Sequence, residues 1–458
     1  YGDHRDLHLS IRRQRQMCIR DRTKSDQLSP TKQKEFTMDS STDFDQIVIP
    51  EGINEPDPLS LYAVLAQVPD KRKRRGKRYE AALVLTLLLL AKLSGENRLS
   101  GIAQWARLRK EWVREHLPLD RDSLPCGNTY HNVCDQVAVD ELNQRLADFF
   151  ASGLAVEVSP TDPSTEELSV EDAVVEELPA KEVVPAPQVP RHWVLDGKTL
   201  RGSHRPSHGE AAQSALALYD LDNHCVLAQP ELAGKGHERA TALALVKKLN
   251  LGGVLLSADA LHTQPAWCRC VREQGGDYLL IAKANQGTLR SDIALLFSEE
   301  PRPWLPEQSA KQVEQAHGRL EIRSLRTSCE LNDYLSPKWP DVAQVFQLRR
   351  TTTRGNHSTT EIVYGLTSLT PQVAPPPKLL RFIREYWQIE NRLHWRRDVT
   401  LGEDACLVSR GQVPQVLAAL NNAILALVDW LGVTNLAAQR RTFAAHPDTA
   451  LALLLQPL

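Results

Sequence analysis

The chain has 458 residues, a formal net charge of −2 and 24% charged residues. This length allows two or three domains with a substantial core, while the charge excludes a globally basic nucleic-acid binder, so that any such binding must come from local patches. The eight cysteines include no Cys-x-x-Cys pair, so we expect reduced thiols in a cytoplasmic protein. The longest apolar run, residues 81–91, is too short to span a bilayer, and we expect no membrane partner.

The N-terminal residues 1–58 are predicted to be a disordered or non-native extension. Residues 1–37 have a surplus of Arg and Lys and little apolar periodicity. From Met38 the sequence becomes progressively more typical of a folded protein. We therefore hypothesise that translation starts at Met38, and that the preceding residues are a tag or a gene-model error.

Residues 59–154 are predicted to form a small all-helical domain, because apolar residues recur there at helical spacing. Within it, residues 71–78 contain seven basic residues in eight positions, directly before an apolar helix. Such a run is often only a solvated face, but a folded scaffold can also present it to DNA phosphates. The candidate phosphate contacts in this run are Lys71, Arg72, Lys73, Arg74 and Arg75.

The composition changes sharply over residues 155–190. Nine acids stand there against the single Lys181, and six prolines are interspersed. This composition is typical of an extended acidic linker, because it supplies too little apolar surface for a core. We expect it to separate the helical domain from a second domain at residues 191–432.

The second domain opens with residues 193–195, a β-branched and aromatic run that predicts a buried strand ending at Asp196. Gly197 is expected to permit a turn there, and Lys198 and Arg201 follow with charges suited to phosphate. Alone, this pattern would fit an ordinary strand end. The order of the elements that follow gives it a second interpretation.

Two apolar runs around an Asp/Asn cluster, residues 215–219 and 225–229, predict a hairpin. A helix, a strand ending at Asp259, a second helix and a strand ending before Lys283 then follow. If the fourth strand returns beside the first through a right-handed crossover, Asp196 and Asp259 meet. Two converging carboxylates are costly unless a cation neutralises them, and oxygen ligands select Mg²⁺ or Mn²⁺. This order predicts an α/β ribonuclease-H-like fold with a mixed sheet.

Residues 287–375 are rich in short predicted strands and form either a β-rich insertion or a simple extension of the sheet. A long helix is predicted over residues 379–397, where Glu390, His394 and Arg397 fall on one face. Glu390 is the candidate third carboxylate. Asp398, Glu403 and Asp404 are competing acids just beyond that helix, and residues 433–458 are expected to be a C-terminal tail.

With these residues in hand, the chain resembles the insertion-sequence DDE transposases, in the group that includes the H-repeat-associated proteins. The resemblance covers roughly residues 59–432 and rests on five segments in the same order. These segments are residues 195–203 (Leu-Asp-Gly-Lys-Thr-Leu-Arg-Gly-Ser), 259–264 (Asp-Ala-Leu-His-Thr-Gln), 283–286 (Lys-Ala-Asn-Gln), 317–319 (His-Gly-Arg) and 389–395 (Ile-Glu-Asn-Arg-Leu-His-Trp).

The resemblance implies that Asp196, Asp259 and Glu390 are a catalytic triad that binds two Mg²⁺ or Mn²⁺ ions for cutting and joining DNA. It further implies double-stranded DNA partners, namely the terminal inverted repeats of the element and a target, a homodimer assembled on DNA, and a bacterial cytoplasmic protein that is nucleoid-associated when bound to DNA. The residues expected to position phosphates are Lys198, Arg201, Lys283, His394 and Arg397.

The chain departs from the wider superfamily's Tyr-x2-Arg-x3-Glu-x6-Lys signature. Ile383 and Tyr386 occupy its first two positions, Glu390 matches its third, and Arg397 keeps only the charge of its last; Arg384 is a candidate substitute. Two alternatives stay open: a domesticated or inactive DNA-binding relative, and a metal-dependent nuclease. The presence of all three acids favours an active transposase, because an abandoned site tends to lose costly clustered charge.

Overall fold

The computed structural model describes residues 57–119, 121–153, 189–205, 211–234, 236–298, 308–316 and 318–457. The predicted N-terminal extension lies outside the described residues except for its last two positions. Most of the predicted acidic linker and His317 of the His-Gly-Arg segment lie outside them as well.

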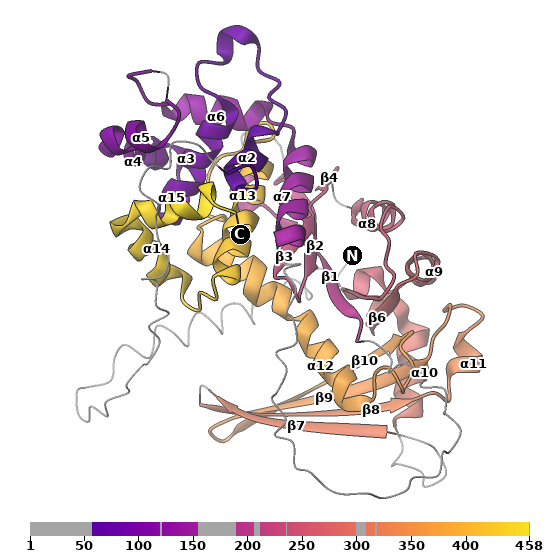
Figure 1. Cartoon of the computed structure of the whole chain (residues 1–458). Coiled ribbons are helices and arrows are strands. Elements are labelled where there is room, and N and C mark those ends of the chain that lie inside the picture. Colours follow the sequence, from indigo (N-terminus) through magenta and orange to yellow (C-terminus); the bar gives the residue numbers. More distant parts are fainter. Residues whose placement is uncertain are drawn as a thin grey trace, which may run out of the picture. The chain divides into compact units, whose positions relative to one another are not determined.

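One mixed sheet organises the chain from residue 191 onward, with the strand order β3-β2-β1-β5-β6-β10-β9-β8-β7 (Figure 1). Strands β1, β2 and β3 form an antiparallel meander, and β5 lies parallel to β1 on its other side, followed by the parallel β6. The strands are β1 (Arg191–Thr199), β2 (Ser214–Asp220), β3 (Cys225–Ala228), β5 (Val254–Ala258) and β6 (Asp277–Ala282), and the short β4 (Glu231–Leu232) pairs with β2. This is the predicted ribonuclease-H-like order, and the predicted return of the fourth main strand beside the first is confirmed.

The sheet continues past β6 through β10 (His357–Thr367), β9 (Gln344–Arg354), β8 (Arg319–Ser328) and β7 (Gln308–Ala316). Strand β10 pairs antiparallel with β6. The β-rich segment therefore extends the central sheet, which is the simpler of the two interpretations.

Neighbouring residues along the strands point to opposite faces, and both faces are buried, as a sheet with parallel central strands requires. Leu195, Leu256 and Leu280 share one core cluster with residues of three helices, α8 (Glu238–Val246), α9 (Pro265–Glu273) and α10 (Gly287–Leu296). On the other face, Leu255 and Leu279 pack with residues of α12 (Pro376–Tyr386).

The residues N-terminal to the sheet form the helices α2 (Leu61–Ala66), α3 (Ala81–Leu93), α4 (Leu99–Leu108), α5 (Lys110–His116), α6 (Gly127–Gln136) and α7 (Val139–Gly153), with the short turn η2 (Arg74–Gly76) after the start of the basic run. All of α3 is buried. It packs against α13 (Val413–Trp430), α14 (Leu436–Ala445) and α15 (Pro447–Leu455). Helices from the two ends of the described chain thus pack together.

The segment expected to be a C-terminal tail instead forms the helices α14 and α15. The last six residues of α15, Ala450 to Leu455, are all buried, and Trp112 of α5 donates a hydrogen bond to Asp448. The apolar run of α15 needs a partner, and α2 and α3 provide it. Among the described residues, α13 alone is long and apolar enough to cross a membrane, but 89% of it is buried inside the protein, as in a core helix.

The helix predicted over residues 379–397 is interrupted. Helix α12 ends at Tyr386, and the chain continues in π-helical turns, η7 (Ile389–His394) and η8 (Arg396–Thr400). A π-helical turn holds more residues than an α-helical turn, so side chains that share one face of an α-helix diverge here. The prediction that Glu390, His394 and Arg397 line one helical face is therefore corrected.

Candidate active site

Asp196 and Asp259 are brought together by the pairing of two parallel strands. In that pairing Leu195 of β1 lies opposite Ala258 of β5, so the next residue of each strand is an aspartate. Strand β5 ends there, and Asp259 caps the short turn η5 (Ala260–His262) by accepting a hydrogen bond of 2.9 Å from the Leu261 amide. The two acids predicted to meet thus follow directly from one register of the sheet.

Gly197 does not make the turn that the sequence predicted, because β1 continues to Thr199. Its missing side chain has another role. A Cβ on Gly197 would lie 2.8 Å from the Oε1 atom of Glu238, the first residue of α8. Since Leu195 and Gly197 face α8, the glycine lets a carboxylate of that helix approach the strand beside Asp196.

Glu390 reaches the site from the opposite face, on η7, which packs against β1. Its approach is evident at Tyr386, whose pKa is raised well above its ordinary value by burial and by the charges of Asp196, Asp259, Glu390 and Glu238. One phenol therefore lies within the electrostatic reach of all three predicted triad acids. Those acids come from β1, the end of β5 and a segment more than a hundred residues later.

The carboxylates destabilise one another's charged forms. Burial, and then the negative charge of Glu238, raise the pKa of Asp196 to about 7. The pKa of Asp259 is raised by burial and by the charges of Asp196 and Glu238, while His262 acts in the opposite direction. Such repulsion is what a bound divalent cation relieves, and raised carboxylate pKa values are typical of functional sites.

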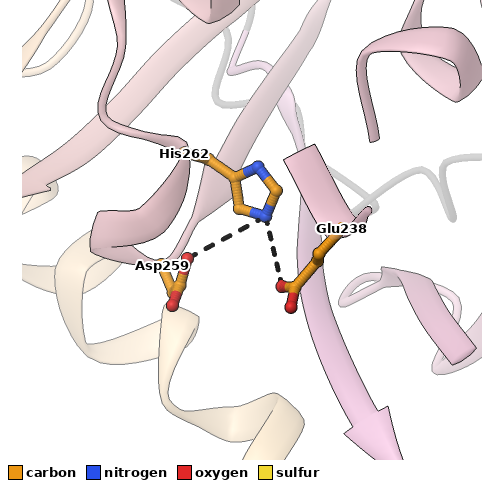
Figure 2. Close-up of side chains that lie close together, drawn as sticks. All are labelled: Glu238, Asp259 and His262. Atoms are coloured by element: carbon orange, nitrogen blue, oxygen red, sulfur yellow. Dashed lines mark ion pairs between the residues drawn. The ribbon is translucent and has the colours of Figure 1, made fainter. Parts of the chain in front are cut away.

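Glu238 and His262 are two site residues that the sequence interpretation missed. The Nε2 atom of His262 lies 3.5 Å from Glu238 Oε1 and 3.9 Å from Asp259 Oδ1 (Figure 2). One ligand atom from each of the three side chains lies within 4.8 Å of the other two. A usable signal was present in the sequence: an acid two residues after the Gly-Lys-Gly of residues 234–236 at a helix start, and a His three residues after Asp259.

Comparison with known protein families identifies the family to which the chain belongs. The family model described as "Transposase DDE domain" matches residues 187–427, more than half of the chain and the whole of the site described above. The chain belongs to the transposase DDE domain family. A second model, described as "DDE_Tnp_1-associated", matches residues 62–150, the helices that precede the sheet.

Individual relatives of this transposase are distant. It is 28% identical to "Uncharacterized protein in dhlA 3'region" of Xanthobacter autotrophicus over 62% of its own length and 85% of that protein. It is 27% identical to the "H repeat-associated putative transposase YhhI" of Escherichia coli K12 over 51% of its own length and 63% of that protein. The resemblance to H-repeat-associated proteins is thus confirmed.

Among solved structures, the transposase is similar to a piggyBac transposase synaptic complex with hairpin DNA. The TM-score is 0.40 at 9% identity, covering 87% of this chain and 82% of that one. A similarity at this level supports no argument about the site.

The cations predicted to position phosphates fall into two groups in the transposase. Lys283 is exposed directly after β6, and Arg201 is exposed on η3 (Arg201–Ser203), where it pairs with Asp404 at 3.2 Å. The side chain of Lys198, in contrast, is 6% exposed and pairs with Asp398 and, at 3.8 Å, with Glu403. Lys198 therefore neutralises buried acids beside the site.

His394 contacts an acid of the triad. Its Nε2 atom lies 3.0 Å from Asp196 Oδ2, and its Nδ1 atom is buried without a hydrogen-bond partner in the described part of the chain. Burial and the neighbouring charge of Lys198 lower the pKa of His394 to about 3, so the ring is neutral. A neutral ring can donate its Nε2 hydrogen to the Asp196 carboxylate and hold it in place.

Arg397 is buried away from solvent, with its side chain 1% exposed. Its guanidinium donates two hydrogen bonds of 2.9 Å to Glu403 and further ones to Gln229 and Asn422. Arg384, the candidate substitute from the signature, pairs with Glu314 of β7 at 2.7 Å. Through its own hydrogen bonds, Arg397 connects η8 with three other segments: the loop that follows η8, the loop after β3, and helix α13.

The predicted DNA-contacting run before α3 is mostly exposed. Lys71, Lys73, Arg74 and Arg75 face solvent. Arg72 differs, because its guanidinium donates to both carboxylate oxygens of Asp70 and to the Tyr79 carbonyl, and its side chain is 6% exposed. Four of the five predicted cations are therefore available to a partner.

Proposed function

We propose that this transposase cuts and joins DNA at the ends of a bacterial insertion sequence, with Asp196, Asp259 and Glu390 as ligands of two Mg²⁺ or Mn²⁺ ions. The observation that carries the proposal is geometric: the register of β1 and β5 places Asp196 beside Asp259, and η7, which carries Glu390, packs against β1. The donor set fits, because carboxylate oxygens are the ligands these ions prefer. When bound, such ions activate a water or a 3′-hydroxyl and stabilise the leaving oxygen of a phosphodiester.

The residues around the triad orient it. His394 donates to Asp196 and fixes the direction of that carboxylate, while Lys198 offsets the negative charge of Asp398 and Glu403 just behind it. The exposed Lys283 and Arg201 lie where strand β6 and strand β1 leave the sheet, and they contact DNA phosphates there. Arg397 and Lys198 support the site from inside the protein.

The partners follow from this chemistry. We propose double-stranded DNA, namely terminal inverted repeats and a target, as the substrate, with the exposed cations at residues 71–75 adding phosphate contacts. A homodimer that brings two element ends together fits this activity. We place the protein in the bacterial cytoplasm, nucleoid-associated when bound to DNA.

The test uses the full chain and a plasmid carrying the inverted repeats that flank the gene. Strand cleavage and joining are measured with Mg²⁺, with Mn²⁺ and with EDTA. Metal-dependent cleavage followed by joining supports the proposal. Cleavage without joining would make the protein a nuclease, and DNA binding without cleavage would make it an inactive relative. Asp122→Asn, which changes an exposed surface acid with 86% of its side chain accessible, is the matched control for Asp196→Asn.

A further inference from the structure

Glu238, Asp259 and His262 form a compact ligand set on the α8 side of the site. Figure 2 shows the imidazole of His262 directed between the two carboxylates, with its Nε2 atom toward both. Two ligands bound to one ion at about 2.1 Å can be at most about 4.2 Å apart. The distances of 3.5 Å and 3.9 Å from Nε2 to the two oxygens meet that limit.

His262 is placed as a metal ligand would be, with its Nε2 atom near two carboxylates. Its side chain is 1% exposed, and Nε2 is buried without a hydrogen-bond partner among the residues the structure describes. A buried polar nitrogen normally has a partner, since leaving it unsatisfied is costly. A hydrogen-bonded imidazolium–carboxylate pair would close to about 2.7–2.9 Å, well below the separations seen here.

The three side chains are held from behind, as ligands must be. The ring of His262 packs on Trp267, with 4.9 Å between ring centroids. The Asp259 carboxylate is fixed by the Leu261 amide, and Glu238 occupies the space left by Gly197. This support keeps the nitrogen and both oxygens facing one point.

We propose that Glu238 and His262 complete, with Asp259, a mixed nitrogen and oxygen subsite for one divalent ion, and that this subsite prefers a transition-metal ion such as Mn²⁺ to Mg²⁺. An imidazole nitrogen favours transition metals, whereas Mg²⁺ favours oxygen ligands. Asp259 is shared with the triad, so the inference rests on the proposed function. Glu238 and Glu390 approach the strand ends from opposite faces of the sheet, and each would serve a different ion.

The experiment measures metal binding by the full-length protein without DNA. Mn²⁺ binding is titrated by electron paramagnetic resonance, Mg²⁺ by competition, and a nitrogen ligand is detected by ¹⁴N modulation of the Mn²⁺ echo. Wild type should show the modulation. His262→Ala should lose it and bind Mn²⁺ at least about tenfold more weakly, with Mg²⁺ affinity changed less than about threefold. Glu238→Gln should weaken Mn²⁺ binding similarly but keep the modulation.

His357→Ala, at an exposed hairpin position, is the matched control and should behave as wild type. Absence of ¹⁴N modulation in wild type would overturn the inference, a result that does not depend on any variant folding. Persistence of the modulation in His262→Ala would overturn it as well. Glu390→Gln separates the two proposals: it should retain the modulation while cleavage is lost. Normal cleavage by that variant would refute the triad and leave the subsite intact. If the wild-type protein lacks the ¹⁴N modulation but still cleaves DNA, the subsite is refuted and the triad is unaffected.

Discussion

Gly197 lies directly against the carboxylate of Glu238, so close that a Cβ on the glycine would be 2.8 Å from Oε1. The obstructing atom is the far end of a side chain, which can move, and Gly197 is in an extended strand that any residue can adopt. The absence of a side chain on Gly197 therefore leaves room for the carboxylate of Glu238 from the neighbouring helix.

Gly197→Ala should therefore leave the protein folded and displace Glu238 from the site. We expect a melting temperature within a few degrees of wild type, with Mn²⁺ binding weakened about as much as in Glu238→Gln. Thermal melting and Mn²⁺ titration check this. The double variant Gly197→Ala/Glu238→Gln should bind no more weakly than either single one, because both act through the same carboxylate. Fully additive losses would contradict it.

Glu390→Gln should abolish metal-dependent strand cleavage while leaving DNA binding nearly unchanged, as should Asp259→Asn. The substitutions keep size and hydrogen bonding but remove the charge that a divalent ion needs. Cleavage assays and gel-shift titrations with the same DNA give the two measurements. Asp404→Asn, on the partner of Arg201, serves as the comparison and should cleave at a rate closer to wild type. If Asp404 proves essential for cleavage and Glu390→Gln cleaves normally, Glu390 is not the third acid of the triad.

Arg397→Met should destabilise the protein by about 3–5 kcal/mol, because it removes the closest cation of the buried Glu403 and both of the hydrogen bonds that this cation donates. Adding Glu403→Gln should restore part of that loss. Denaturant unfolding measures both variants. The salt dependence of DNA binding by the folded fraction should be unchanged, since Arg397 is buried. A flatter salt dependence would indicate that Arg397 contacts DNA phosphates.

Replacing Lys71, Lys73, Arg74 and Arg75 with Gln should weaken binding to all DNA sequences similarly. The slope of log affinity against log salt should fall by about 0.9 for each phosphate that the protein no longer neutralises. Arg72→Gln is an informative comparison: it should lower stability through the loss of its bonds to Asp70 and Tyr79, with little effect on the slope. An unchanged slope in the fourfold variant would make the run a solvated face.

The metal-free protein should lose stability as the pH rises from about 4 to about 7. The pKa of Asp196 is about 7 in the folded protein against an ordinary 3.8, so the folded state binds the proton more tightly across this window and the advantage disappears as the pH passes the folded value. Mg²⁺ competes with that proton, and it should raise the melting temperature more at about pH 8 than at about pH 6. Asp196→Asn should flatten the pH dependence and remove most of the Mg²⁺ effect. Equal Mg²⁺ shifts at both pH values would contradict this account.

The sequence by itself determined the order of the central strands and the meeting of Asp196 with Asp259. Both aspartates end short apolar runs, so a right-handed return of the fourth strand beside the first brings them to the same edge of the sheet. The structure shows the register that does so, with Leu195 paired with Ala258. Period-two patterning and strand order are local and topological properties, which a sequence carries directly. Glu390 was singled out by its place in a resembling motif as much as by helical spacing, because that spacing fails in the π-helical turns.

Tertiary structure alone decided which charges face the site. In the sequence Lys198 and Arg397 look like phosphate ligands, yet both are buried against acids. Lys198 pairs with Asp398 from a distant segment and Arg397 pairs with Glu403 in the loop that follows η8, whereas Lys283 stays exposed. Glu238 and His262 become visible only once α8 lies against β1 and the turn after β5 directs the imidazole between two carboxylates. The direction of a charged side chain depends on which surfaces pack around it, and those surfaces come from distant parts of the chain.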